Sequence, residues 1–315
     1  MKRIILIATA LSVTLAVRGW VRTDIVPFPS HYIDLQAGAG MGGLSYDLNG
    51  GTSSAAPSFF FGAGYTWFFL PSAGFQTGVQ LSWLSTTATL SEPMEWTRRQ
   101  DGTPLKDYMG EEYAHRITFA DWRERQQALL LEVPVGLRFR HFASADGKFG
   151  FHSAAGALLT IPVIANYTHT SGTLTHTGWY EQWRLLLHDV PGRYETEPYQ
   201  RQRESFLSRV QPFSLTAYAE AGVLIHMGER TELAVAAYIH WMPIDWVSAG
   251  KNERTQLGFA NDRNGYTFMP EYHGLIGTDR TGVVHPWSAG VKVLLSLWPG
   301  QTNRQHKRCM CAGMK

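Results

Sequence analysis

The sequence predicts an all-β protein, an eight-stranded, antiparallel, up-and-down transmembrane β-barrel with long extracellular loops. Segments with an apolar residue at every second position recur eight times in the 315 residues, and a period of two is typical of strands. The links between these segments alternate between short and long, as in outer-membrane barrels with short periplasmic turns and longer outer loops. The chain also begins with a segment that resembles a secretory signal peptide.

The clearest alternation spans residues 129–140. Every odd position from 129 to 139 is apolar, whereas the even positions include Glu132, Arg138 and Arg140. A membrane barrel would place the apolar face in lipid and the charges in the lumen. A soluble sandwich or barrel remains an alternative, in which the apolar face is buried and the charges lie in water.

The other segments repeat this pattern. We expect the strands at residues 31–47, 58–70, 73–90, 128–142, 149–167, 212–227, 231–247 and 285–298. Pro134 and Pro162 interrupt it, because proline removes a ladder donor, so each is expected to mark a bulge or a local break. Aromatic residues near the strand ends predict two girdles, formed at the short-turn end by Tyr65, Trp67, Phe69, Phe139, Phe149 and Trp298 and at the long-loop end by Trp83, Trp241, Trp246 and Trp287.

The ends of the chain predict three regions. A basic start followed by an apolar stretch predicts a signal peptide over residues 1–23, with a short N-terminal membrane anchor as the alternative. Residues 24–300 form the barrel, and residues 301–315 form a disordered, basic periplasmic tail. Cys309 and Cys311 in this tail are one residue too close for the usual metal spacing. We therefore expect no metal site and no cofactor.

The predicted lumen contains charged residues of both signs. An eight-stranded barrel encloses just enough room for side chains, and buried charges must be paired. We therefore expect an ion-pair network that plugs the lumen, although a narrow pore or a proton path remains open as an alternative. The network comprises Asp34, Glu132, Arg138, Arg140, His152, Glu220, Glu232 and Lys292.

Three long loops carry many aromatic residues. Aromatic side chains mixed with arginine resemble an interaction surface, but the same residues could pack into a rigid cap over the barrel mouth. The candidates for the interaction surface are Trp96, Trp122, Trp179, Trp183, Tyr194 and Tyr266. Short helices are expected over residues 108–125 and 201–210.

Residues 131–139, Leu-Glu-Val-Pro-Val-Gly-Leu-Arg-Phe, resemble a known strand. The pattern is similar to the Leu-Glu-Ile-Pro-x-x-x-Lys-Tyr strand of an outer-membrane β-barrel domain widespread in Bacteroidota, sometimes called the PorT-like barrel family. Residues 75–81 and 219–223 resemble two other strands of that family. The resemblance implies an outer-membrane barrel, and because some members serve secretion machinery it suggests a role in an envelope assembly.

These observations together predict a non-enzymatic integral barrel of the bacterial outer membrane with its termini in the periplasm. Its expected partners are outer-membrane lipid, lipopolysaccharide and a protein of an envelope assembly, whereas the net charge of +2 is too small to indicate nucleic acid. The alternatives are a narrow pore for small solutes and an outer-membrane hydrolase or acyltransferase. Candidate residues for an enzyme are His115, His169, His176, His188, His240, Ser171 and Asp121.

Overall fold

The computed structural model describes residues 30–96, 105–107, 109–143, 148–188, 195–196, 203–228, 230–248, 257–261 and 268–299. In this part of the chain strands predominate, and the only helical segments are two 3₁₀ turns, Glu181–Trp183 and Leu207–Arg209. No helix among these residues is long and apolar enough to cross a bilayer. The predicted signal peptide, tail and tail cysteines lie outside the described residues.

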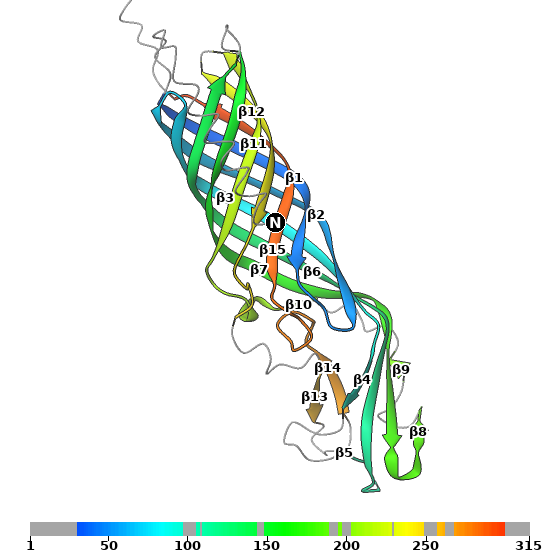
Figure 1. Ribbon diagram of the computed structural model, residues 1–315. Helices are drawn as coiled ribbons and strands as arrows, with labels where there is room; N and C mark the ends of the chain where they lie inside the picture. Colours follow the sequence, from blue (N-terminus) through cyan, green and yellow to red (C-terminus); the bar gives the residue numbers. More distant parts are fainter. Residues whose placement is uncertain are drawn as a thin grey trace, which may run out of the picture.

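Eight strands close into a barrel (Figure 1). Each strand pairs antiparallel with its neighbours in the ring, and the first and last strands meet with Ile33 opposite Leu297. The strands are β1 (His31–Ser45), β2 (Gly51–Leu70), β3 (Ala73–Leu90), β6 (Glu112–Phe142), β7 (Phe149–Tyr180), β11 (Ser214–Gly228), β12 (Thr231–Trp241) and β15 (His285–Leu297). The predicted eight-stranded antiparallel barrel is confirmed.

The alternation of link lengths is confirmed at six of the seven links. The exception is the link between β1 and β2, which was expected over residues 48–57 but spans only residues 46–50 at the long-loop end. The links after β2, β6 and β11 span two, six and two residues and lie at one end of the barrel, whereas those after β3, β7 and β12 are long and lie at the other. Since Ile33 pairs with Leu297, the start of β1 and the end of β15 meet at the short-turn end.

Burial alternates along the barrel strands in the sense opposite to that of a soluble barrel. Large apolar side chains lie exposed on the outer face, while charged and polar side chains lie buried inside. Exposed apolar residues include Ile33, Leu35, Met41, Phe59, Phe61, Val79, Val135, Leu137, Phe151, Leu159, Val163, Leu215, Val223, Val235, Ile239, Val291 and Val293. The assignment of Trp246 to an aromatic girdle was wrong, because its side chain is fully buried among the loops.

Both prolines disturb the ladder as predicted. Beside Pro162 the pairing of β6 with β7 shifts register, since Leu129 opposes Ile164 whereas Leu130 opposes Pro162. Opposite Pro134 the ladder between β3 and β6 is interrupted, and it resumes in the same register. A missing backbone donor accounts for both irregularities, as one bulge and one local break.

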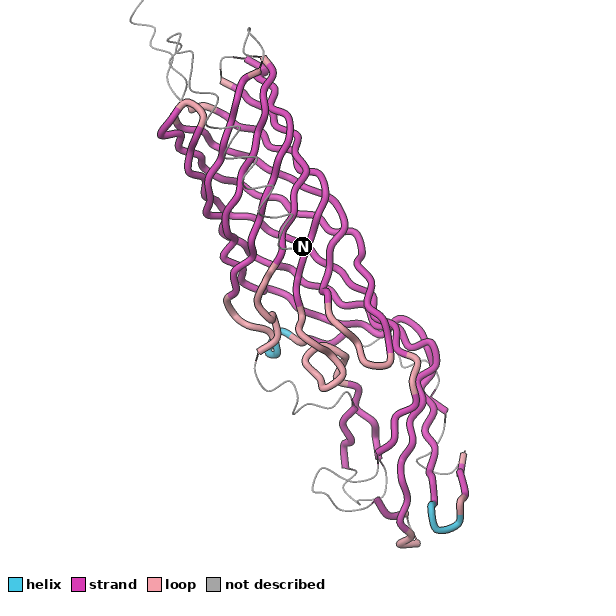
Figure 2. Tube along the Cα trace, viewed as in Figure 1, coloured by secondary structure: helices cyan, strands magenta, loops and turns pink. Residues whose placement is uncertain are grey.

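Strands β6 and β7 continue well past the barrel and form a long arm (Figure 2). The expected start of β6 and the expected end of β7 were therefore wrong, whereas the end of β6 at Phe142 and the start of β7 at Phe149 are as expected. The helix expected over residues 108–125 was also wrong, since most of this segment is strand. The helix expected over 201–210 is only a short strand and a 3₁₀ turn. The arm is flanked by β4 (Pro93–Trp96), β5 (Leu105–Lys106), β8 (Leu185–Leu187) and β9 (Glu195–Thr196), whereas β10 (Arg203–Ser205) pairs with β7 nearer the barrel, and β13 (Leu257–Asn261) and β14 (Phe268–Tyr272) form a separate hairpin.

The arm leaves the barrel at an irregular point in the hairpin (Figure 2). The pairing of β6 with β7 changes register between Ala120 and Arg123. Asp121 in this segment has a φ of 48°, and the facing Gly172 has a φ of 110°. Only glycine fits at position 172, because an added Cβ would lie 2.4 Å from the Cα of Trp122. This double irregularity allows the two strands to bend away while remaining paired.

Candidate functional site, the packed lumen and its cap

The lumen at the short-turn end holds a buried ion pair between β6 and β12. The Nη1 atom of Arg140 donates to Oε1 of Glu232 at 2.9 Å, and the hydroxyl of Tyr32 donates to the same oxygen at 2.9 Å. The guanidinium group of Arg140 also lies 3.8 Å from the ring centre of Phe68. Charge, hydrogen bonding and aromatic packing together hold this layer.

A second buried pair joins β6 to β1. Nη1 of Arg138 donates to Oδ1 of Asp34 at 3.1 Å, and neither side chain reaches solvent to a significant extent. Two hydroxyl groups complete the carboxylate shell, since Ser296 donates to Oδ1 at 2.5 Å and Thr66 donates to Oδ2. The pair therefore draws on residues from four strands.

A third cluster places one carboxylate between two basic groups. Nζ of Lys292 donates to Oε2 of Glu220 at 2.6 Å, and Nε2 of His152 lies 2.9 Å from Oε1. All three side chains are buried, and they come from β15, β11 and β7. The barrel thus brings together seven of the eight residues expected in the network as pairs or a triad.

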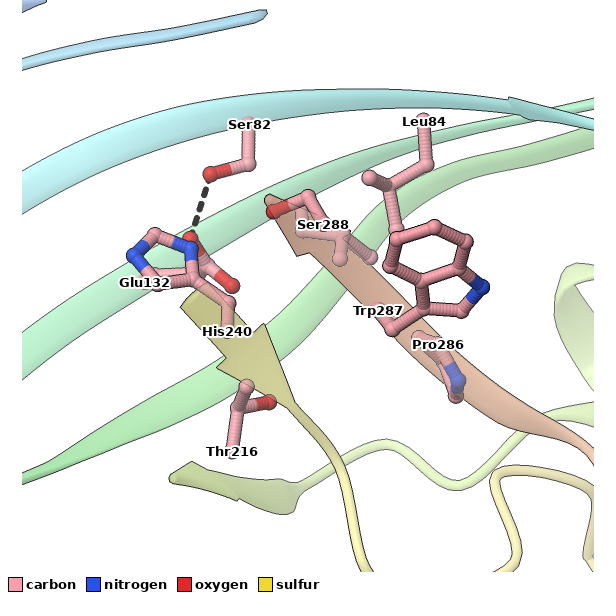
Figure 3. A pocket seen from close by; sticks show the side chains of 9 residues that line it. Ser82, Leu84, Glu132, Thr216, His240, Pro286, Trp287 and Ser288 are labelled. Atoms are coloured by element: carbon pink, nitrogen blue, oxygen red, sulfur yellow. Dashed lines mark hydrogen bonds between the residues drawn. The ribbon is translucent and has the colours of Figure 1, made fainter. Parts of the chain in front are cut away.

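Glu132 is the exception, because its carboxylate accepts hydrogen bonds from neutral groups. Its Oε2 accepts from Nε2 of Gln80 at 2.7 Å and from the hydroxyl of Ser82 (Figure 3). A cavity of about 10 Å³ lies beside Glu132, His240 and Ser288. That is about the space of one water molecule, so this cavity is too small for a substrate.

Aromatic rings fill the space over three glycines of the barrel wall, Gly38, Gly136 and Gly156. The phenol of Tyr218 lies over the paired residues Gly136 and Gly156, and a Cβ at Gly136 would lie 2.2 Å from its hydroxyl oxygen. The Phe60 ring occupies the corresponding space over Gly38. Together with the ion pairs, these rings occupy much of the interior, and an eight-stranded barrel encloses just enough room for side chains.

At the long-loop end a hydrophobic cluster closes the barrel mouth. Its members come from strand ends and from the loops after β7, β12 and β14, and most are almost fully buried. The cluster comprises Leu44, Tyr46, Leu48, Leu84, Ala88, Leu90, Phe119, Trp122, Ala128, Leu130, Ala165, Tyr167, Phe206, Val210, Met242, Trp246, Val247, Tyr272, Leu275, Ile276 and Val284. We call this cluster the cap.

A buried carboxylate anchors the loop after β14 within the cap. Oε2 of Glu124 accepts hydrogen bonds from the hydroxyl of Tyr272 at 2.7 Å and from the backbone amide of Leu275 at 3.1 Å. Gln126 donates to its other oxygen at 2.7 Å. Burial raises the pKa of Glu124 above its ordinary value, and these hydrogen bonds and the charge of Arg209 only partly oppose that rise.

Glu124 was not among the residues singled out from the sequence, although the pattern contained a signal. The alternation of β6 continues from Ala128 back to Trp122, with Trp122, Glu124 and Gln126 on the same buried face as Ala128. Extending the period of two into the segment expected to be a loop would have placed this carboxylate inside.

The aromatic residues expected to form an interaction surface are divided by the structure. Trp122 is fully buried and stacks on His169 with ring centres 3.9 Å apart, so its assignment to a surface was wrong: it packs into the cap. Trp179 is half-buried in the arm, and Trp183 is 53% exposed. The side chain of Trp96 and all of Tyr194 and Tyr266 lie outside the described part.

Trp183 ends a short stack of rings in the arm. The ring of Tyr180 lies 5.2 Å from that of Trp183 and 5.6 Å from that of Tyr113, with interplanar angles of 18° and 27°. The hydroxyl of Tyr180 donates to Asp107 at 2.8 Å. The stack holds the exposed indole in a fixed position.

The candidate residues for an enzyme do not form a described catalytic arrangement. His169 and His240 are both buried, one against Trp122 and the other against Phe60 and Tyr238, whereas Asp121 is exposed where the arm begins. The side chains of His115 and His176 are outside the described set, and His188 is exposed. Within that set no group of three His, Cys, Asp or Glu side chains is placed to hold a metal ion.

Three solved structures are similar to the chain at low identity. OprG from Pseudomonas aeruginosa is 9% identical, with 85% of this chain and 97% of that chain covered and a TM-score of 0.32. Ail of Yersinia pestis, in complex with the heparin analogue sucrose octasulfate, is 9% identical, with coverages of 84% and 99% and a TM-score of 0.26. The translocator domain of NalP from Neisseria meningitidis is 8% identical, with coverages of 92% and 94% and a TM-score of 0.21.

TM-scores of this size do not establish a shared fold, so the barrel is established by its own strand pairing. No protein-family model matches the chain, and no curated protein is significantly similar to it. The resemblance to the PorT-like barrels of Bacteroidota therefore stays a prediction.

Proposed function

We propose that the chain is an integral protein of the bacterial outer membrane that serves as a closed, non-enzymatic anchor for an envelope assembly. The observation that carries this proposal is the inverted barrel, with apolar side chains outside and ion pairs inside. In water this arrangement would leave a large apolar surface exposed. In a bilayer it satisfies both faces.

The height of the apolar surface matches a membrane. The outer face of β6 is apolar at every odd position from Leu129 to Phe139. Ten residues span roughly 33 Å along a strand, and at a tilt of about 40° this corresponds to about 25 Å along the barrel axis, the usual height of the apolar band in outer-membrane barrels.

The packed lumen supports an anchor over a pore. Arg138, Arg140 and Glu220 each span the interior to residues on another strand, and aromatic rings occupy the space between these layers. A conducting lumen would need an open path that these side chains fill. The narrow pore for small solutes is therefore the second candidate.

The arm supports an accessory role. It extends from the long-loop end (Figure 1), which faces outward in the proposed orientation. It carries the exposed indole of Trp183, which stacks on the ring of Tyr180. Exposed Leu185 lies on the neighbouring β8 strand. Rigid aromatic residues beside aliphatic ones are typical of the residues that dominate protein–protein binding, so we assign a protein partner to this part of the arm.

Recovery of the protein from native membranes tests the proposal. We expect the full chain to need detergent for extraction and to bring down a protein partner, and we expect Trp183→Ala with Leu185→Ser to lose that partner. Val283→Ser is the matched control, because it also replaces an exposed apolar residue but lies outside the arm. Val283 belongs to the loop whose Gly282 amide donates to the carbonyl oxygen of Asp47 beside β1. Recovery of the native protein strictly alone would contradict the accessory role, and extraction without detergent would contradict the membrane location.

A further inference from the structure

Three exposed arginines lie on the outer face just beyond the apolar surface, at the long-loop end. Beyond Leu129 the outward positions of β6 are Gln127, Arg125 and Arg123, and both arginines are exposed. The third, Arg203 on β10, is also exposed. We call these three residues the arginine patch.

Strand pairing places the three residues of the arginine patch side by side. Thr168 of β7 opposes Arg125 on one side and Arg203 on the other. Two strand spacings separate their backbones by about 10 Å, and Arg123 lies about 7 Å further along β6. Long side chains at these distances can direct their guanidinium groups to one ligand.

The arginine patch lacks countercharges among the described residues. Nε of Arg125 donates to the hydroxyl of Ser85 at 3.4 Å. The side-chain amide of Asn166 is oriented so that its nitrogen donates to the carbonyl oxygen of Ala165. Its oxygen then accepts hydrogen bonds from Nη2 and Nε of Arg203 at 2.9 and 3.1 Å. The nearest acidic residue along β10, Glu204, instead accepts from the inward-facing hydroxyl of Tyr167. No described ion pair includes any of the three arginines.

The outward neighbours of the patch are also uncharged. Across β3 the residues opposite Arg125 and Arg123 are Thr87 and Thr89, and across β7 Ser171 faces Arg123. Glu124, between the two arginines, is buried on the inner face, so Asp121, exposed where β6 bends, is the one acidic residue near the patch on the outward face of this strand. The surface is therefore net positive.

We propose that the arginine patch binds the phosphate groups of lipopolysaccharide headgroups packed against the barrel. Arg125 lies four residues before Leu129 in the chain, which places their Cα atoms about 13 Å apart along the strand and about 10 Å apart along the barrel axis. The patch therefore begins where headgroups replace acyl chains. Guanidinium groups match phosphate oxygens in a bidentate geometry. Continuity with the apolar surface favours a lipid over an acidic protein, and the inference rests on the proposed membrane location.

Binding of purified lipopolysaccharide to the detergent-solubilised full chain tests this site. We expect Arg123→Gln, Arg125→Gln and Arg203→Gln together to weaken binding on the order of 100-fold, since each basic residue at a membrane surface contributes about five-fold. Dephosphorylated lipopolysaccharide should bind the native protein about as weakly. Arg184→Gln, which removes an exposed arginine from the arm, should leave binding unchanged.

The outcomes separate this inference from the proposed function. Equal binding of dephosphorylated lipopolysaccharide, equal binding by the triple variant, or equally tight binding of phosphatidylglycerol would overturn the assigned ligand. Every variant must first show the heat-modifiable electrophoretic mobility of a folded barrel inserted in vesicles. Failure of the native chain to insert would instead overturn the membrane location, whereas insertion without phosphate-dependent binding overturns only the arginine patch.

Discussion

Replacing Lys292 by methionine tests whether the lumen is packed or filled with water. Lys292 and Glu220 are 4% and 5% exposed, with Nζ 2.6 Å from the carboxylate. Removing one partner of a dry, buried pair costs about 3–5 kcal/mol, because the other charge is left uncompensated. Removing one partner of a hydrated pair costs about 0–1 kcal/mol. His152 remains beside Glu220, so we expect a loss near the lower end of the first range.

The double variant Glu220→Gln, Lys292→Met shows where that loss originates. With the carboxylate neutralised, no charge is stranded, so the double variant should be more stable than Lys292→Met alone. The measurement is urea unfolding in lipid vesicles, followed by tryptophan fluorescence and by electrophoretic mobility. Such a recovery is the signature of coupling between two buried groups.

The exposed pair Lys106–Glu112 serves as the control. Its nitrogen and oxygen are 3.7 Å apart and the side chains are 56% and 61% exposed, so Lys106→Met should change the free energy of unfolding by less than about 0.5 kcal/mol. The reasoning would be refuted if Lys292→Met also cost less than about 1 kcal/mol, or if the two lumen substitutions were simply additive.

Three further predictions concern the lumen and the cap. In planar bilayers the native barrel should produce no conductance steps, and sustained single-channel steps would favour the pore. Gly136→Ala should cost about 1–3 kcal/mol because it displaces Tyr218, whereas Gly282→Ala, with its nearest neighbour at 3.5 Å, should be neutral in the same unfolding assay. Because burial raises the pKa of Glu124, its contribution to cap stability should be greatest below pH 4.5 and fall as the pH rises through the folded-state pKa. Hydrogen exchange at the Leu275 amide, corrected for intrinsic rates, should show this trend in the native chain and lose it in Glu124→Gln.

The sequence predicted the barrel well because an apolar outer face and a polar interior impose a period of two on each strand. Where the two faces of a strand differ most in polarity, as from Leu129 to Phe139, the residue type indicates the face at nearly every position. The same logic located the seven paired lumen residues, because inward-facing side chains in so narrow a barrel lie within reach of one another. The strand order followed from the alternation of link lengths.

The arm and the cap were harder to predict because their physical constraint is different. Before Leu129 both faces of β6 carry polar residues, such as Glu124 beside Arg123 and Arg125, and this weakens the hydrophobic signal. The cap is built from residues far apart in the chain, with Trp122 packed against Tyr272. A pattern within one segment cannot indicate such a contact, so Trp122 was assigned to the surface.

The numbers of acidic and basic residues in the lumen explain how these residues pair in the structure. Four acidic and three firmly basic residues were expected inside, so one carboxylate had to lack a basic partner, and the structure identifies it as Glu132. Its position explains how it is tolerated: among the charged residues of the network on β6 it lies furthest from the short-turn end, next to the cavity and to donors from β3. Arg138 and Arg140 lie deeper toward the short turns, where each requires a carboxylate from another strand. The charged network therefore braces the half of the barrel nearer the short turns, while neutral donors and the cap fill the half nearer the long loops.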